Sequence, residues 1–253
     1  MDKGRTFLNK LLAGLALFSI EYIIVIMLFV GAFFTFLFVS REIFIAQDHE
    51  FDLKAFEFLE RVQSPGMTTF MESITFLATL EFIIVAGTIT FLYFFFVKKH
   101  PWYGVKVPAV AFGSASLNVF LKYFFNRPRP DLPLIEAFGL SFPSGHAMVS
   151  FAFYGLLIFI IHKEVKSFGL RFILISALAL LIILIGISRI YLRVHFATDV
   201  IAGFALGAIW LIITIGVLRK IERFTRNMVD SALQNKNVIC KIKLFFINFG
   251  CVK

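Results

Sequence analysis

The chain has little charge and almost no cysteine, and each shortage excludes a class of protein. Charged side chains make up 16% of its 253 residues, whereas a soluble globular domain carries about 25%. The two cysteines, Cys240 and Cys251, lie near the C-terminus and offer neither a disulfide framework nor a zinc-binding pattern. The composition therefore argues against a soluble domain and against a fold held together by cysteine chemistry.

Hydrophobic side chains make up 59% of the chain, and 35 residues are phenylalanine. They fall in long blocks, which is the pattern that a lipid bilayer requires. The formal net charge is +9, but the basic residues stand in short clusters at the ends of these blocks and form no single stripe. This distribution favours contact with anionic lipid headgroups, and it predicts no nucleic-acid partner.

The apolar blocks predict an all-α, polytopic membrane protein whose fold is a bundle of six transmembrane helices. Basic residues cluster at the N-terminus, after the second and fourth blocks, and in the tail, so the positive-inside rule places both termini in the cytoplasm. Residues 1–218 are predicted to form one membrane domain, and residues 219–253 a basic cytoplasmic tail. The predicted spans are Leu11–Ser40, Ile74–Val97, Val105–Phe125, Ser144–Ile161, Phe172–Ile187 and Ala197–Leu218.

The first outer loop, Arg41–Ser73, is predicted to contain an amphipathic helix. Polar residues such as Asp52 lie between apolar residues that recur at helical spacing. A helix of this kind is suited to lie on the membrane surface or to cap the bundle, and the turn Ser64–Gly66 is expected to end it. The apolar positions of this helix are Phe51, Ala55, Phe56, Leu59 and Val62.

Three polar clusters interrupt the apolar second half of the chain, at Lys122–Pro130, Pro143–His146 and Ser188–Asp199. In the predicted topology the third and fifth spans end outside and the fourth and sixth begin there, so all three clusters meet at the outer face. Charges this close to hydrocarbon are costly unless they pair or line a wet cavity, and they are functional by default. A functional site is therefore predicted at the outer face of a cell membrane.

The cations of these clusters suit a phosphate group. Lys122, Arg129 and Arg189 come from three separate segments, and guanidinium groups match phosphate oxygens in pairs while lysine acts as a point charge. Ser144 and Gly145 open the fourth span, where free backbone N–H groups and the helix dipole form an anion site. A glycine at this place also allows close approach of the phosphate to the backbone.

The remaining polar residues suit a nucleophile and an acid. His195 and Asp199 are four positions apart, on one face of a helical turn. A carboxylate bonded to one ring nitrogen leaves the other nitrogen free to attack phosphorus. His146 opens a different helix, where it is placed to protonate the leaving oxygen as general acid. No metal site is predicted, because two histidines among cations would repel a divalent ion.

Three further residues have two interpretations each. Arg127 and Arg193 are either additional phosphate contacts or charges that face lipid headgroups, and the sequence favours the latter. Asn118 lies one turn before Lys122, where it either orients the lysine amine or pairs with a neighbouring helix.

The three clusters resemble the signature of the type 2 phosphatidic acid phosphatase superfamily, which is K-x6-R-P, then P-S-G-H, then S-R-x5-H-x3-D. Every spacing of the signature is present between residues 122 and 199. The resemblance implies a six-helix bundle, a phosphohistidine intermediate on His195 and no metal or other cofactor. It implies lipid phosphate substrates such as phosphatidic acid, phosphatidylglycerophosphate, undecaprenyl diphosphate or lipid A phosphates. It assigns phosphate binding to Lys122, Arg129, Ser144, Gly145, His146 and Arg189.

The function predicted from the sequence is removal of a phosphate, by hydrolysis, from a membrane lipid that carries a monophosphate or a diphosphate group. One alternative is a lipid phosphotransferase, which would use the same histidine but pass the phosphoryl group to an alcohol. Another is a transporter or channel with an anion site at its outer mouth. Such a protein is expected to have broken helices or paired half-sites near the bilayer midplane, and the sequence indicates neither. The sequence leaves the oligomeric state open.

Overall fold

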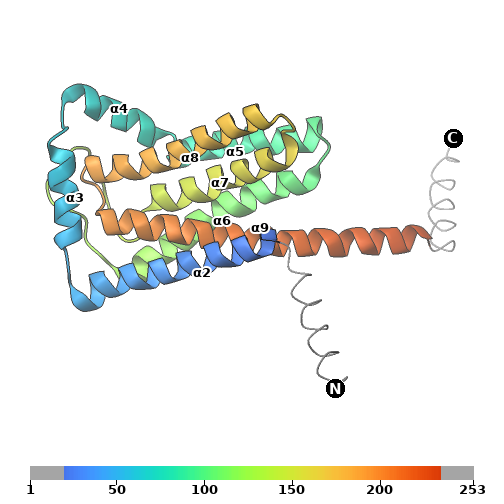
Figure 1. Ribbon diagram of the computed structural model, residues 1–253, viewed down its shortest axis with the longest axis horizontal. Helices are drawn as coiled ribbons and strands as arrows, with labels where there is room; N and C mark the ends of the chain where they lie inside the picture. Colours follow the sequence, from blue (N-terminus) through green and yellow to red (C-terminus); the bar gives the residue numbers. More distant parts are fainter. Residues whose placement is uncertain (1–19, 235–253) are drawn as a thin grey trace, which may run out of the picture. The chain divides into compact units, whose positions relative to one another are not determined.

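Residues 20–234 are described by the computed structural model, and within them the chain is helical with no strand (Figure 1). By the contacts between its residues, the chain divides into two compact units, with the boundary after Ile212. The helical elements in chain order are α2 Ile20–Arg41, η1 Glu42–Ala46, α3 Glu50–Glu60, α4 Pro65–Phe76, α5 Leu80–Leu92, η2 Tyr93–Val97, α6 Pro101–Phe125, α7 Gly145–Glu164, α8 Phe168–Tyr191 and α9 Ala197–Gln234.

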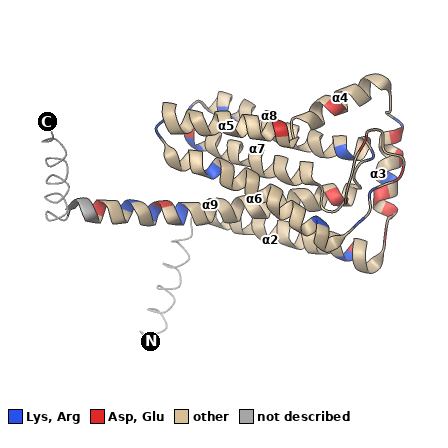
Figure 2. Ribbon diagram, turned by 180° about the vertical axis from the view of Figure 1, so that it is seen from behind, with Lys and Arg blue, Asp and Glu red and all other residues tan. Residues whose placement is uncertain are grey.

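The predicted fold class, an all-α membrane protein with six spans, is confirmed. Within the described part of the chain, six helical segments are long and apolar enough to cross a bilayer. In Figure 2 most of these helices carry few charged residues along their lengths, whereas the far part of α9 carries several and acidic residues gather on α3. The six segments are Tyr22–Ala46, Leu80–Val97, Pro101–Phe125, Gly145–Glu164, Phe168–Tyr191 and Ala197–Ser231.

The predicted start of the second span was wrong. The second span begins at Leu80 and not at Ile74, because Pro65–Phe76 forms a separate helix, α4. The Ser64 side chain accepts a hydrogen bond from Met67 N and caps α4, so the turn that was expected only to end the loop helix also starts the next one. The tail predicted to follow Leu218 begins as a continuation of α9, which runs to Gln234. Its remainder, with Cys240 and Cys251, lies outside the described residues, as does the start of the first predicted span.

The predicted amphipathic helix of the first loop is present as α3, but its faces differ from the prediction. Asp52, expected on the polar side, is only 1% exposed, whereas Phe51 is 56% exposed. Together α3 and α4 lie across one end of the bundle (Figure 1). Met71 of α4 packs against Tyr191 at the end of α8, and the Tyr191 hydroxyl lies 3.2 Å from the Thr68 hydroxyl. The first loop therefore caps the bundle at the end where α8 finishes.

Helix α7 lies at the centre of the bundle, between α6 and α8. The first part of α9 also approaches it closely, through two glycines on one face. A Cβ atom on Gly203 would lie 2.7 Å from the Ser144 carbonyl oxygen, and one on Gly207 would lie 2.6 Å from that of Met148. Any side chain at these positions would push the two helices apart, so both glycines are needed to bring the start of α9 against the start of α7.

A cluster of phenylalanine rings fixes the loop between α6 and α7. Phe142, fully buried, packs against Phe36 of α2 and Phe125 at the end of α6, with ring centroids 6.1 and 4.9 Å away. Phe44 of η1 completes the cluster, 5.3 Å from Phe142. Phe142 precedes Pro143 across a cis peptide bond. This packing holds the chain in place immediately before the helix that carries the second polar cluster.

Candidate active site

The three polar clusters of the sequence meet at the capped end of the bundle. Each comes from a helix end or from the loop beside one, so the bundle geometry sets the distances between them. Lys122 lies in the last turn of α6, Arg129 in the loop that follows, Ser144, Gly145 and His146 at the start of α7, Arg189 in the last turn of α8, His195 in the α8–α9 loop, and Asp199 in the first turn of α9.

His195 is held between an anion and a cation. Its Nδ1 lies 3.4 Å from Asp199 Oδ2, and its Nε2 lies 3.4 Å from Arg129 Nη1. The side chain is only 2% exposed. Burial lowers the pKa of His195 to about 4, and outweighs the opposing effect of Asp199. The ring is therefore neutral at pH 7, with the Nε2 edge directed toward the cations.

Both carboxylate oxygens of Asp199 have fixed partners. Oδ1 accepts a hydrogen bond of 2.6 Å from Arg127 Nη1. Oδ2 accepts one of 2.9 Å from Phe196 N and another from the Ser141 hydroxyl. Since Asp199 is fully buried, these partners set the position of the oxygen that faces His195.

The signature cations bind carbonyl or hydroxyl oxygens in this structure. Lys122 Nζ donates to Leu140 O at 2.6 Å. Arg129 donates from Nη1 to Val194 O at 2.6 Å and from Nη2 to Phe138 O at 3.0 Å. Partial burial lowers the pKa of Arg129 from its usual value. The two cations are thus held by neutral carbonyl oxygens, and a phosphate would be a stronger partner for either.

Arg189 contributes a third cation to the site and, unlike the partly buried Lys122 and Arg129, it is buried. Its Nη1 donates to Thr75 Oγ1 of α4 at 2.7 Å. Its Nε is buried and has no hydrogen-bond partner among the described residues. A buried donor without an acceptor is costly, and an acceptor such as a phosphate oxygen would relieve that cost.

The start of α7 offers backbone donors beside these cations. The Ser144 hydroxyl accepts from Ala147 N, and Ser144 N donates to Asp199 O at 3.0 Å. The N–H groups of Gly145 and His146 keep no acceptor among the described residues. A Cβ atom on Gly145 would lie 2.9 Å from Asn118 Oδ1, so the backbone there admits no larger residue without displacing Asn118.

The ring of His146 is half-buried and lies within electrostatic range of the other signature residues. The charges of Arg189, Lys122 and Arg129 act on it, as does His195. No hydrogen bond to another described side chain fixes this ring. His146 therefore lies beside the cations and His195.

Of the three residues with two interpretations, Asn118 matches one of them, whereas Arg127 and Arg193 form ion pairs with carboxylates instead. Arg127 was expected to face lipid headgroups, and this is wrong: it is 5% exposed and forms ion pairs with Asp52 and Asp199. Asn118 does not orient Lys122; its Nδ2 donates to Pro143 O at 3.1 Å and so ties α6 to the start of α7. Arg193 pairs with Glu60 of α3 at 3.1 Å, and within residues 20–234 its side chain forms no ion pair with a signature residue.

Three residues that the sequence did not single out take part in the site. Asp52, Ser141 and Thr198 all contact Asp199 or its partner Arg127. For Asp52 the sequence offered one signal, an acidic residue between the apolar positions of the helix in the first loop, but this position predicted a place on the polar face. Ser141 and Thr198 are ordinary polar residues beside signature positions, and nothing in their spacing identified them.

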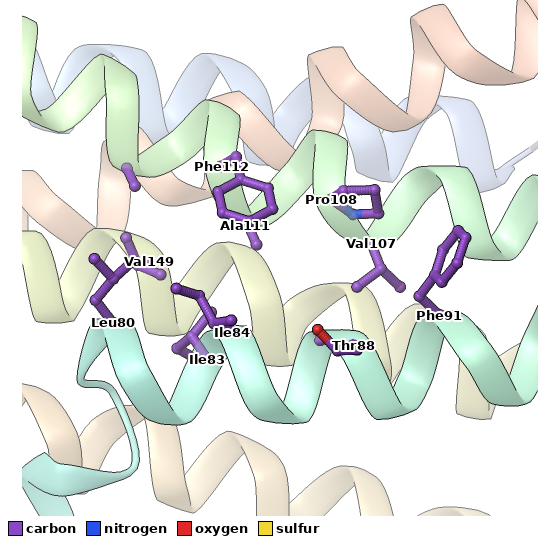
Figure 3. A pocket seen from close by; sticks show the side chains of 12 residues that line it. Leu80, Ile83, Ile84, Thr88, Phe91, Val107, Pro108, Ala111, Phe112 and Val149 are labelled. Atoms are coloured by element: carbon purple, nitrogen blue, oxygen red, sulfur yellow. The ribbon is translucent and has the colours of Figure 1, made fainter.

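One hollow borders the site, and another lies between helices of the bundle. One, of about 190 Å³, is lined by Lys122 together with Tyr123, Phe138 and neighbouring residues. The other, of about 260 Å³, lies between α5, α6 and α7 and is lined almost entirely by hydrocarbon (Figure 3). Val149, one turn after His146 on α7, lines this second hollow. Within residues 20–234, no group of three or more His, Cys, Asp or Glu side chains is placed to hold a metal ion.

Comparison with known proteins gives consistent matches. The model of the PAP2 superfamily matches residues 103–223. Phosphatidylglycerophosphatase B of Bacillus subtilis (strain 168) is 33% identical over 165 residues, which are 64% of this chain and 81% of that protein.

Two solved structures share the fold. The crystal structure of a transmembrane PAP2 type phosphatidylglycerolphosphate phosphatase from Bacillus subtilis matches with a TM-score of 0.70 and 30% identity, over 78% of this chain and 98% of that one. The crystal structure of Aquifex aeolicus LpxE matches with a TM-score of 0.51 and 27% identity, over 65% of this chain and 94% of that one.

Proposed function

Because the chain belongs to the PAP2 superfamily of membrane lipid phosphatases, we propose that it hydrolyses a lipid phosphate with His195 as the nucleophile. The observation that carries this proposal is the position of His195, buried between Asp199 and Arg129 with its Nε2 facing the cations. A neutral imidazole in this place has a lone pair on Nε2, and a phosphate held by the cations would present its phosphorus to that lone pair.

In the first step, His195 Nε2 attacks phosphorus, and the bond from phosphorus to the lipid oxygen breaks. Protonated His146 gives its proton to that oxygen, so the lipid leaves as an alcohol. The phosphohistidine that forms carries positive charge on its ring, and the Nδ1–H faces Asp199 Oδ2. The Asp199 carboxylate stabilises this charge. Lys122, Arg129 and Arg189 balance the negative charge on the phosphoryl oxygens.

In the second step, neutral His146 takes a proton from water while the water oxygen attacks phosphorus. The bond from phosphorus to Nε2 breaks, and its electron pair returns to His195. Inorganic phosphate leaves and His146 is protonated again, so the enzyme is restored. In this reaction three protein cations and the N–H groups at the start of α7 supply the positive field, and no metal is required.

The phosphatidylglycerophosphatase name of the Bacillus subtilis relative supports phosphatidylglycerophosphate as the first substrate to test. The other lipids for a comparative panel are phosphatidic acid, undecaprenyl diphosphate and a lipid A phosphate. We propose that the site faces the outside of the cell membrane and that both termini are cytoplasmic, as the distribution of basic residues indicates.

The test is phosphate release by purified protein on this panel, with His195→Ala as the control. Release from one or more lipids by the wild type, and none from the variant, is the expected result. Wild-type turnover that persists in the variant would overturn the role of His195. Release in the absence of an acceptor lipid separates hydrolysis from phosphoryl transfer to an alcohol.

A further inference from the structure

A buried ion network joins the outer-loop helix α3 to the carboxylate beside His195. Arg127 Nη2 lies 3.0 Å from Asp52 Oδ2, and Arg127 Nη1 lies 2.6 Å from Asp199 Oδ1. All three side chains are buried: Arg127 is 5% exposed, Asp52 1% and Asp199 0%. One guanidinium group is thus shared between a carboxylate of the loop and a carboxylate of the candidate active site.

Thr198 closes this network. Its backbone N–H donates to Asp52 Oδ1 and its hydroxyl donates to Asp52 Oδ2, both at 2.8 Å. The same hydroxyl accepts from Arg127 Nη1 at 2.9 Å. Asp52 is therefore attached to the residue next to Asp199, at the first turn of α9. The Arg127 guanidinium also lies over the Phe196 ring, 4.0 Å from its centroid, which blocks movement to that side.

Attaching a loop to a bundle through three buried charges has a high cost in free energy. Desolvation of each charge opposes folding, and well-packed apolar residues would often serve stability equally well. Moreover, α4 already anchors the loop through apolar contacts with Tyr191 and Leu192. The arrangement needs another reason, and its contact with Asp199 supplies one.

We propose that Asp52 is a positioning residue for the reaction: it binds one end of Arg127, so that Arg127 takes only Oδ1 of Asp199 and leaves Oδ2 facing His195. Helix α3 is thereby a working part of the active site. An arginine freed from Asp52 would bind both oxygens of Asp199 as a fork. His195 would then lose the partner that orients its ring and stabilises its charge during phosphoryl transfer. This inference rests on the proposed function, because it assumes that His195 and Asp199 act together.

The chain contains a matched control for the attachment of α3. Glu60, at the end of the same helix, pairs at 3.1 Å with Arg193 of the α8–α9 loop. This pair also attaches α3 to the rest of the bundle, but through the loop before α9; Glu60 is 60% exposed, and no contact of either side chain with Asp199 is found among the described residues. Loss of the Glu60 pair therefore reports on attachment of the helix alone.

The experiment compares Asp52→Asn with Glu60→Gln in the full-length protein, on whichever lipid phosphate the wild type turns over. Asp52→Asn keeps the size of the side chain and removes its charge. We expect it to lower kcat about 10–100-fold, as loss of an outer partner of a catalytic group commonly does, with KM within about twofold. Glu60→Gln should keep the kcat of the wild type. The melting temperature shows whether each variant is folded. Dividing kcat by the number of vanadate-binding sites corrects the rate for any unfolded protein.

A double-mutant cycle shows whether Asp52 acts through Asp199. If it does, Asp52→Asn will change kcat little in an Asp199→Asn background, because the carboxylate that it positions is already absent. Equal losses in both backgrounds would overturn the inference. If Asp52→Asn fails to fold, Thr198→Val takes its place, since it removes the hydroxyl between Arg127 and Asp52 and keeps all three charges. It should likewise lower kcat and leave KM unchanged.

The outcomes separate this inference from the function on which it rests. Wild-type turnover, abolished in His195→Ala but unchanged per folded site in Asp52→Asn, would overturn the positioning role alone. A similar loss of kcat in Asp52→Asn and Glu60→Gln would also overturn it, because attachment of α3 would then explain both. Absence of phosphate release by the wild type would overturn the proposed function and this inference with it.

Discussion

The low pKa of His195 predicts a loss of stability in acid whose size follows from the structure. Burial brings the pKa to about 4 in the folded protein, against about 6.5 for an unperturbed histidine. Between these values the unfolded chain binds a proton that the folded chain does not. The free energy of unfolding therefore falls as the pH falls through this window. At about 1.4 kcal/mol for each pKa unit, the total loss is about 3 kcal/mol.

The measurement is the apparent melting temperature of detergent-solubilised protein between pH 7 and pH 4. His195→Asn removes the titrating ring and keeps a polar side chain, so its melting temperature should fall less with acid than that of the wild type. For a protein of this size, 3 kcal/mol corresponds to a difference of about 6–12 °C. His162→Asn is the control: His162 is exposed near the end of α7, and its loss should leave the wild-type pH dependence unchanged.

Two results would refute this reasoning. If His195→Asn lost stability in acid as steeply as the wild type, the ring would not be the group that resists protonation. If instead His162→Asn reduced the fall of the melting temperature in acid, the fall would come from a histidine at the surface. Either result would also remove the argument that His195 is neutral, and therefore nucleophilic, in the free protein at pH 7.

Three other predictions concern the reaction and its sidedness. His146→Ala should lower turnover of a lipid monoester about 10²–10⁴-fold but lower turnover of a nitrophenyl phosphate far less, because nitrophenolate leaves without a proton; equal single-turnover losses on both substrates would contradict its role as the acid. Activity should persist in EDTA and be inhibited by vanadate, whose adduct on His195 mimics the transition state; loss on chelation that a divalent ion restores would refute metal-free transfer. Cysteines placed in the loop of residues 126–142 should react with an impermeant thiol reagent in intact cells, and a cysteine at Lys98 should not; the reverse pattern would place the site in the cytoplasm.

The sequence was sufficient to predict which helix ends come together. Hydrophobic block length and the positions of basic residues gave six spans, and the direction of each span then brought Lys122, His146 and His195 to one end. The sequence also placed the start of the fourth span correctly at Ser144 and Gly145. Local signals were insufficient for the break between α4 and α5, because residues 77–79 contain no proline or glycine. Only the Thr79 cap, which accepts a hydrogen bond from Phe82 N, marks the new helix start.

The faces of α3 and the role of Arg127 could not be predicted, and the two failures have one cause. Helical spacing shows which residues share a face, but a partner elsewhere in the chain decides whether that face is buried. Asp52 alone belongs in water, and Arg127 alone belongs among headgroups, because a single buried charge is costly. Their pairing, 75 residues apart in the chain, reverses both expectations at once. Asp52 is an acid among apolar positions, and Arg127 is an arginine in the first polar cluster that the family signature does not include. Their direct contact accounts for both.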